Sequence, residues 1–223
     1  MMRNVGRPLA SLFVIGLCAA LSGCLKSNPN ETLLRQLESK DFLKYAGPKA
    51  DAIREEIRQK GWPAIFGDSG RVFSADGLTL AKGGVTAFIG KVRPFLEGQG
   101  VKLPDLKDDL KQESYSVLVD GAPLPIWTKE DLGRELALQP GITSGLAAAR
   151  SFALINKLLE TVGSKERAYA LYSGAALSVM FVTDDLLAVM KADPMAVPKF
   201  IPYKLTTDFP FFGQPQNLSL IHI

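Results

Sequence analysis

Hairpin patterns alternate with helical patterns along this chain, and that order restricts the folds open to it. Asp120-Gly121 is a two-residue turn signal between two apolar runs, and Ser173-Gly174 has the same place in a second hairpin. A third hairpin is predicted over 62–77, with arms at 64–66 and 71–74. Antiparallel pairing follows, because short turns join neighbouring strands that run in opposite directions.

The helical patterns lie between these hairpins. Apolar residues recur at helical spacing over segments 31–47, 47–61, 83–100, 129–138, 142–163 and 183–193. Thr128, followed by Asp131 three residues later, predicts an N-cap, and Thr183 predicts another. The chain is therefore expected to be α+β, with a mainly antiparallel sheet built from hairpins and helices packed on one face.

The first 24 residues have the layout of a secretory signal. Arg3 and Arg7 form a basic start, and an almost uncharged apolar run over 9–21 follows, too short to span a membrane. The run ends in Leu21-Ser22-Gly23-Cys24, which resembles the lipobox of bacterial lipoproteins. The resemblance implies a diacylglycerol on the Cys24 sulfur, cleavage before Cys24, and acylation of the new amino terminus. The alternative is an ordinary cleaved signal peptide with an incidental cysteine.

The same resemblance implies a place in the cell. Two or three acyl chains anchor a protein stably, since each buried CH2 contributes about 0.8 kcal/mol. The residue after the cysteine is Leu25 and not an aspartate. This pattern resembles that of the Gram-negative lipoproteins that are exported to the outer membrane. We therefore expect residues 1–23 to be a signal peptide, 24–30 a lipidated tether and 31–217 a single domain, lipid-anchored in the cell envelope and facing the periplasm.

The last six residues, 218–223, match the in-frame translation of a transposase mosaic end that sequencing libraries carry. We therefore expect them to be an adaptor artefact and leave them out of the folded domain. They hold His222, the one histidine of the chain. The alternative is a genuine apolar tail.

Charge and cysteine content exclude several function classes. Removal of residues 1–23 takes two of the 26 basic side chains and none of the 23 acidic ones, which leaves a formal charge of +1. Such a balance gives no electrostatic basis for a nucleic-acid partner. Cys18 leaves with the signal and Cys24 carries lipid, so the domain has no disulfide and no cysteine metal site. No cofactor is expected.

Catalytic chemistry has little support in the sequence. A Ser-His-Asp or Cys-His arrangement needs an imidazole, which the chain lacks outside the adaptor. The acidic stretch 105–110, DLKDDL, has no calcium-loop spacing and is expected to be a solvated turn, and Asp184 and Asp185 fit the first turn of a helix. No catalytic and no metal-binding residue is therefore assigned. The alternative function is a carboxylate-dependent hydrolase acting on peptidoglycan or another glycan.

Aromatic residues at the ends of elements are the candidates for binding a partner. They are Trp62, Tyr203, Phe209, Phe211 and Phe212. The expected function is non-catalytic binding or assembly with another envelope protein, including a toxin that an immunity- or inhibitor-type lipoprotein neutralises. A binding protein should expose an apolar patch, whereas a hydrolase should hold at least two acids in a concave pocket.

Overall fold

The computed structural model describes residues 28–137, 140–173 and 176–214, and it has an α+β fold. Eight α-helices are found there: α1 (Pro29–Glu38), α2 (Ala50–Lys60), α3 (Trp62–Ile65), α4 (Gly77–Thr79), α5 (Val85–Gly98), α6 (Lys129–Leu136), α7 (Ile142–Thr161) and α8 (Asp184–Ala192). The strands are β1 (Val72–Ser74), β2 (Leu106–Leu110), β3 (Tyr115–Val119), β4 (Ala122–Trp127), β5 (Arg167–Ser173) and β6 (Ala176–Val182). Short helical turns η1 (Phe42–Tyr45), η2 (Gly47–Lys49), η3 (Leu80–Gly84) and η4 (Pro198–Phe200) complete the order.

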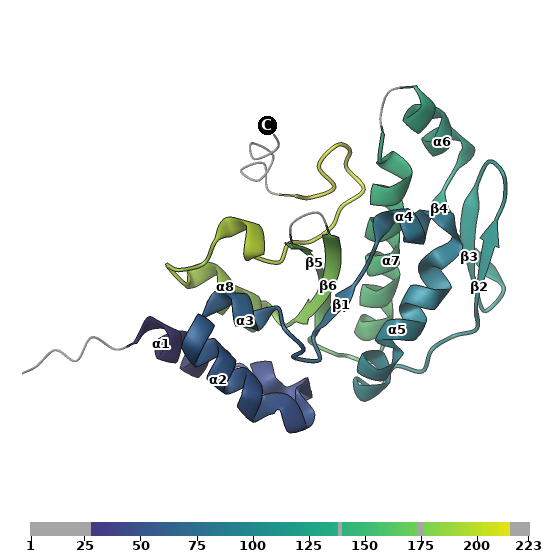
Figure 1. Ribbon diagram of the computed structural model, residues 1–223. Helices are drawn as coiled ribbons and strands as arrows, with labels where there is room; N and C mark the ends of the chain where they lie inside the picture. The colour runs from purple at the N-terminus through teal and green to yellow at the C-terminus, as the bar shows by residue number, and fades with distance from the viewer. Residues whose placement is uncertain (1–27, 138–139, 174–175, 215–223) are drawn as a thin grey trace, which may run out of the picture.

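These strands form two antiparallel sheets of three strands each. One has the order β1-β6-β5 and the other the order β2-β3-β4. Helices α5 and α7 lie between the two sheets, and α1, α2 and α8 lie on the far side of the first sheet (Figure 1). The predicted α+β class and the antiparallel pairing are confirmed.

Helices cover both faces of the β1-β6-β5 sheet, where the sequence predicted helices on one face. In β6, Met180, Phe181 and Val182 are all fully buried. Met180 packs in a cluster with α1, α2 and α8, whereas Phe181 packs in a second cluster with α5 and α7. A strand buried on both faces has a continuous apolar run in place of alternation, and the end of β6 has such a run.

Two predicted hairpins are confirmed and one is wrong. Strands β3 and β4 join at Asp120-Gly121, both with positive φ, and β5 pairs with β6, while Gly174 of the second predicted turn lies outside the described residues. Residues 64–66, predicted as the first arm of the hairpin over 62–77, instead form the end and the C-cap of α3, which begins after Gly61 at φ 65° and has proline in its first turn. That proline favours a helix start. Strand β1 pairs with β6, with Val72 opposite Met180.

The helix caps agree with the sequence. The Thr128 hydroxyl accepts from the Asp131 N–H, and the Asp131 carboxylate accepts from the Thr128 N–H, so a capping box starts α6. The Thr183 hydroxyl accepts from the Leu186 N–H at 3.2 Å at the start of α8. These caps satisfy N–H groups that have no partner within a helix.

Helix α1 overlaps the end of the predicted amino-terminal tether. This helix starts at Pro29, with Asn28 as its N-cap, so it begins inside the predicted tether 24–30. Cys24 and the predicted adaptor 218–223 lie outside the described residues. Of the helices that the structure describes, none combines the length and the apolar character that a bilayer crossing needs.

Candidate binding site

Four of the five aromatic candidates line a single groove. Tyr203, Phe209, Phe211 and Phe212 border a cavity of about 600 Å³, together with α4, the start of α7 and the ends of β5 and β6. Trp62 lies elsewhere, in the core that α1, α2 and α8 share, and only 5% of it is exposed. We refer to the cavity as the aromatic groove.

Tyr203 forms one wall of the aromatic groove. Its N–H donates to the carbonyl of Ala170 at 2.9 Å and its carbonyl accepts from the Ala170 N–H at 2.8 Å, so the segment extends the edge of β5. The Tyr203 ring stacks on the Tyr172 ring, with centroids 6.2 Å apart. Burial raises the pKa of both hydroxyls, and the nearby Tyr172 adds to the rise at Tyr203.

Phe212 closes the groove at the start of α7. A Cβ built on Gly145 would lie 2.2 Å from the Cε2 of Phe212, so the ring occupies space that only glycine leaves open. The Phe212 N–H donates to the Asp208 carbonyl at 2.7 Å, and its own carbonyl accepts from the Thr206 N–H at 3.0 Å. The segment 206–212 is therefore a closed loop whose last ring rests on α7.

Two apolar side chains of the groove remain open to solvent. Phe211 is 40% exposed and Leu78, in α4, is 61% exposed. At the rim, the hydroxyl of Thr79 donates to the Asp76 carboxylate, which lowers the pKa of Asp76 and keeps this acid charged. An apolar interior with a charged rim is the arrangement of many protein interfaces.

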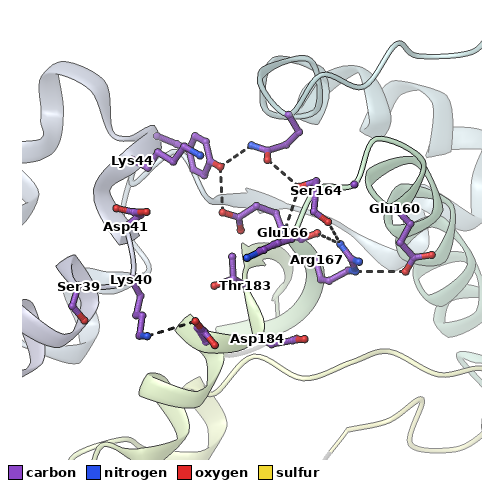
Figure 2. A pocket seen from close by; sticks show the side chains of 15 residues that line it. Ser39, Lys40, Asp41, Lys44, Glu160, Ser164, Glu166, Arg167, Thr183 and Asp184 are labelled. Atoms are coloured by element: carbon purple, nitrogen blue, oxygen red, sulfur yellow. Dashed lines mark hydrogen bonds and ion pairs between the residues drawn. The ribbon is translucent and has the colours of Figure 1, made fainter.

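A second concave site is a polar cleft of about 870 Å³ between η1, the turn from α7 to β5, and the start of α8 (Figure 2). Five acids line it, and four of them have partners. The pairs are Glu166 with Arg71 at 2.9 Å, Glu160 with Arg167 at 3.5 Å, Asp185 with Lys40 at 3.5 Å and Asp184 with the Tyr169 hydroxyl at 2.9 Å. Burial, and then the Asp184 carboxylate, raise the pKa of Tyr169 to about 12.

The base of this cleft is a buried ion pair. Arg71 is 1% exposed, and its Nη1 donates to both carboxylate oxygens of Glu166, at 3.0 and 2.9 Å. Nη1 also donates to the carbonyl of Phe181 at 3.0 Å, while Nε donates to the carbonyl of Phe42 at 2.7 Å and Nη2 to that of Asp41 at 2.9 Å. One guanidinium thus joins η1 to β6 and to Glu166, the residue directly before β5.

A ring of side-chain hydrogen bonds holds Glu166 from the other side. The Tyr45 hydroxyl donates to Glu166 at 3.2 Å, and the Gln99 amide donates to that hydroxyl at 2.7 Å. The Ser164 hydroxyl donates to Gln99 at 3.0 Å and accepts from the Glu166 N–H at 3.1 Å. The network ties η1, the end of α5 and the start of β5 together (Figure 2).

These contacts bear on the hydrolase alternative. Glycoside hydrolysis needs one carboxyl that keeps its proton and a second carboxylate beside it. Three of the cleft's acids instead form ion pairs within the protein, with Arg71, Arg167 and Lys40. Among the described residues, no group of three or more His, Cys, Asp and Glu side chains is placed to hold a metal ion. The cleft therefore gives the hydrolase no specific support.

The prediction of a solvated turn over 105–110 is wrong, because these residues contain strand β2. The Asp108 carboxylate accepts from the Tyr115 hydroxyl and, at 3.3 Å, from the Thr86 N–H. This acid therefore caps the first turn of α5, where negative charge is favourable. Burial and the bond to Asp108 raise the pKa of Tyr115. No local sequence pattern predicts this role, because Asp108 lies 22 residues after Thr86, the residue that it caps.

Comparison with known proteins gives no relative from which a function could be transferred. The chain matches no protein-family model, no curated protein and no solved structure. Any conclusion on function therefore depends on the amino-terminal motif and on the aromatic groove.

Proposed function

We propose that this protein is a lipoprotein of the bacterial cell envelope that binds a protein partner and catalyses no reaction. Acyl chains on Cys24 hold it in the outer membrane, with its folded part in the periplasm. The lipobox-like Leu21-Ser22-Gly23-Cys24, directly behind a short apolar run, supports the anchor. The partner is another envelope protein, or a toxin that this protein neutralises.

The aromatic groove is the observation that carries the binding role. Exposed Phe211 and Leu78 lie in two different segments around one cavity, which the half-buried Phe209 and Phe212 also line. Apolar surface gathered around a hollow, with the charged Asp76 at its rim, favours contact with a partner's apolar side chain. Aromatic side chains supply much of the energy of such contacts.

The position of the groove is compatible with an anchored protein. Segment 203–214, which carries the four aromatic residues, lies well away from the start of α1, where the tether enters the fold (Figure 1). A partner can therefore reach the groove while the amino terminus is held at a membrane.

Photocrosslinking in the intact envelope tests this proposal. Phe211 is replaced by a photoreactive benzoylphenylalanine in the acylated protein, which should then crosslink to one protein species after irradiation. The substitution Leu78→Asp, on the other side of the groove, should abolish that crosslink. The control is Leu136→Asp, at an apolar residue that is 79% exposed and lies outside the groove. The absence of any crosslink, or a crosslink that Leu78→Asp leaves unchanged, would contradict the proposal.

A further inference from the structure

The tether brings one particular face of the protein close to the bilayer. Helix α1 starts at Pro29, and its N-cap Asn28 stands four residues after Cys24. Four residues span at most about 14 Å when fully extended. A lipid on Cys24 therefore holds the surface around Pro29 close to the headgroups.

That surface carries exposed apolar side chains. Met195 is 62% exposed and Val197 is 42% exposed, both in the connection from α8 to η4. Met195 and Pro194 line a hollow of about 400 Å³ together with Pro29 and Thr32 of α1. The apolar residues and the tether entry thus share one side of the molecule.

The connection that presents Met195 is held in place by its own contacts. The Met195 N–H donates to the Asp193 carboxylate at 2.7 Å, and the Ala196 N–H donates to the Asp193 carbonyl at 3.0 Å. Ala196 also packs against the core that includes α1 and α8. Met195 is therefore fixed at the surface by a turn whose next residue is anchored in the core.

A cation lies beside the hollow that Met195 lines. The exposed guanidinium of Arg35, in α1, donates to the hydroxyl of Thr32 at 3.4 Å, and Thr32 lines the hollow together with Met195. The nearby Asp193 is half-buried and its carboxylate accepts from the Met195 N–H. Cations beside apolar side chains favour the interface of a membrane that contains anionic lipids.

We infer that Met195 and Val197 form a second membrane contact, which enters the headgroup region and sets the orientation of the anchored domain. The inference depends on the proposed lipidation of Cys24, because the tether is what brings this face to the bilayer. Segment 203–214, which carries the four aromatic residues, lies apart from the start of α1 (Figure 1), so a partner can reach it with this face on the membrane.

Site-specific fluorescence on the acylated full chain tests the contact. The thiol of Cys24 is taken up by lipid and Cys18 is removed with the signal, so an introduced cysteine is the one free thiol of the mature protein. A fluorophore is attached at Met195→Cys and, as control, at Leu136→Cys, which is exposed on α6. The proteins are reconstituted in vesicles that contain anionic phosphatidylglycerol and bromine-labelled lipid, and acylation is verified by mass spectrometry on the same samples.

The inference predicts that bromolipid quenches the label at 195 several-fold more than the label at 136. In the Met195→Cys protein, Val197→Asp should reduce that difference. Equal quenching at both positions in protein with acylated Cys24 would overturn the inference and leave the anchor intact. A chain without acyl groups on Cys24 would overturn the proposed anchor and this contact together.

Discussion

The ring of Phe212 rests directly on the backbone of Gly145. A Cβ on residue 145 would lie 2.2 Å from Cε2 and 2.4 Å from Cζ of that ring, far inside van der Waals contact. The far end of one side chain meets the helix backbone here, so a larger residue at 145 would displace the ring and leave α7 in place. The shape of the aromatic groove therefore depends on one glycine.

We expect Gly145→Ala to loosen the carboxyl-terminal segment. In a helix, alanine in place of glycine ordinarily stabilises a protein by about 1 kcal/mol. The clash with Phe212 should cancel this gain and expose the bonds after Phe211 and Phe212 to chymotrypsin. The control is Gly133→Ala in α6, where nothing lies within 4 Å of the added Cβ. An equal gain in the free energy of unfolding for both variants, with unchanged proteolysis, would refute this account of the groove.

Removal of one charge from the buried ion pair should be strongly destabilising. Glu166→Gln leaves Arg71, 1% exposed, without its counter-ion, and we expect a loss of about 3–5 kcal/mol in the free energy of unfolding. The same substitution at Glu56, whose pair with Lys60 is exposed, should cost no more than about 0.5 kcal/mol. Urea denaturation of both variants measures the difference, and similar losses would show that the buried pair has no special role.

Asp108 and Asp109 are adjacent acids with different expected effects. Asp108→Ala removes the acceptor of the Thr86 N–H and of the buried Tyr115 hydroxyl, and should cost about 2 kcal/mol in the free energy of unfolding. Asp109 pairs with exposed Lys111, so Asp109→Ala should change that free energy by no more than about 0.5 kcal/mol. Thermal unfolding of the two variants distinguishes them, and a larger loss for Asp109→Ala would contradict the assigned cap.

Stability should fall at alkaline pH because folding buries four tyrosines wholly or in part. Burial raises the pKa of Tyr115, Tyr172 and Tyr203 above the ordinary value of 10.0, and raises that of Tyr169 to about 12. An acid whose pKa is raised by folding stabilises the fold fully at pH values below its pKa in the unfolded chain. This stabilisation is lost as the pH rises through its pKa in the folded chain. The free energy of unfolding should therefore decline from about pH 10 toward pH 12.

Ultraviolet absorbance of tyrosinate in the native protein checks this expectation. The four tyrosine hydroxyls should ionise at higher pH in the folded chain than in the chain unfolded by urea. Tyr169→Phe should make the decline shallower, because it removes one of the shifted groups. Ionisation of these tyrosines near 10.0 in the native state would contradict the assigned burial.

The sequence predicted elements whose signals are local. The Asp120-Gly121 turn, the Thr128 and Asp131 capping box and the Thr183 cap all act within a few residues, and each lies where it was expected. The prediction of a hairpin over 62–77 was wrong because the pairing there is not local. Strand β1 pairs with β6, which is distant in the sequence, and no pattern near residue 72 predicts that pairing.

The candidate site could be predicted only in part. The aromatic segment from Tyr203 to Phe212 stood out in the sequence, and the structure gathers its four candidates around one groove. The role of Gly145 could not be predicted, because this glycine leaves space for the ring of Phe212, which is distant in the sequence. The pair of Arg71 and Glu166 was also missed, since charged residues are mostly exposed and composition gives no reason to bury these two.

The most direct measurement for the account is the mass of the amino-terminal peptide of the protein extracted from membranes of its host. The proposed function predicts that the chain starts at Cys24, with a diacylglycerol on the sulfur and a fatty acid on the amino group. An unmodified Cys24, or a mature chain that starts at another residue and is recovered outside the membrane fraction, would contradict the proposal that this is an anchored binding protein.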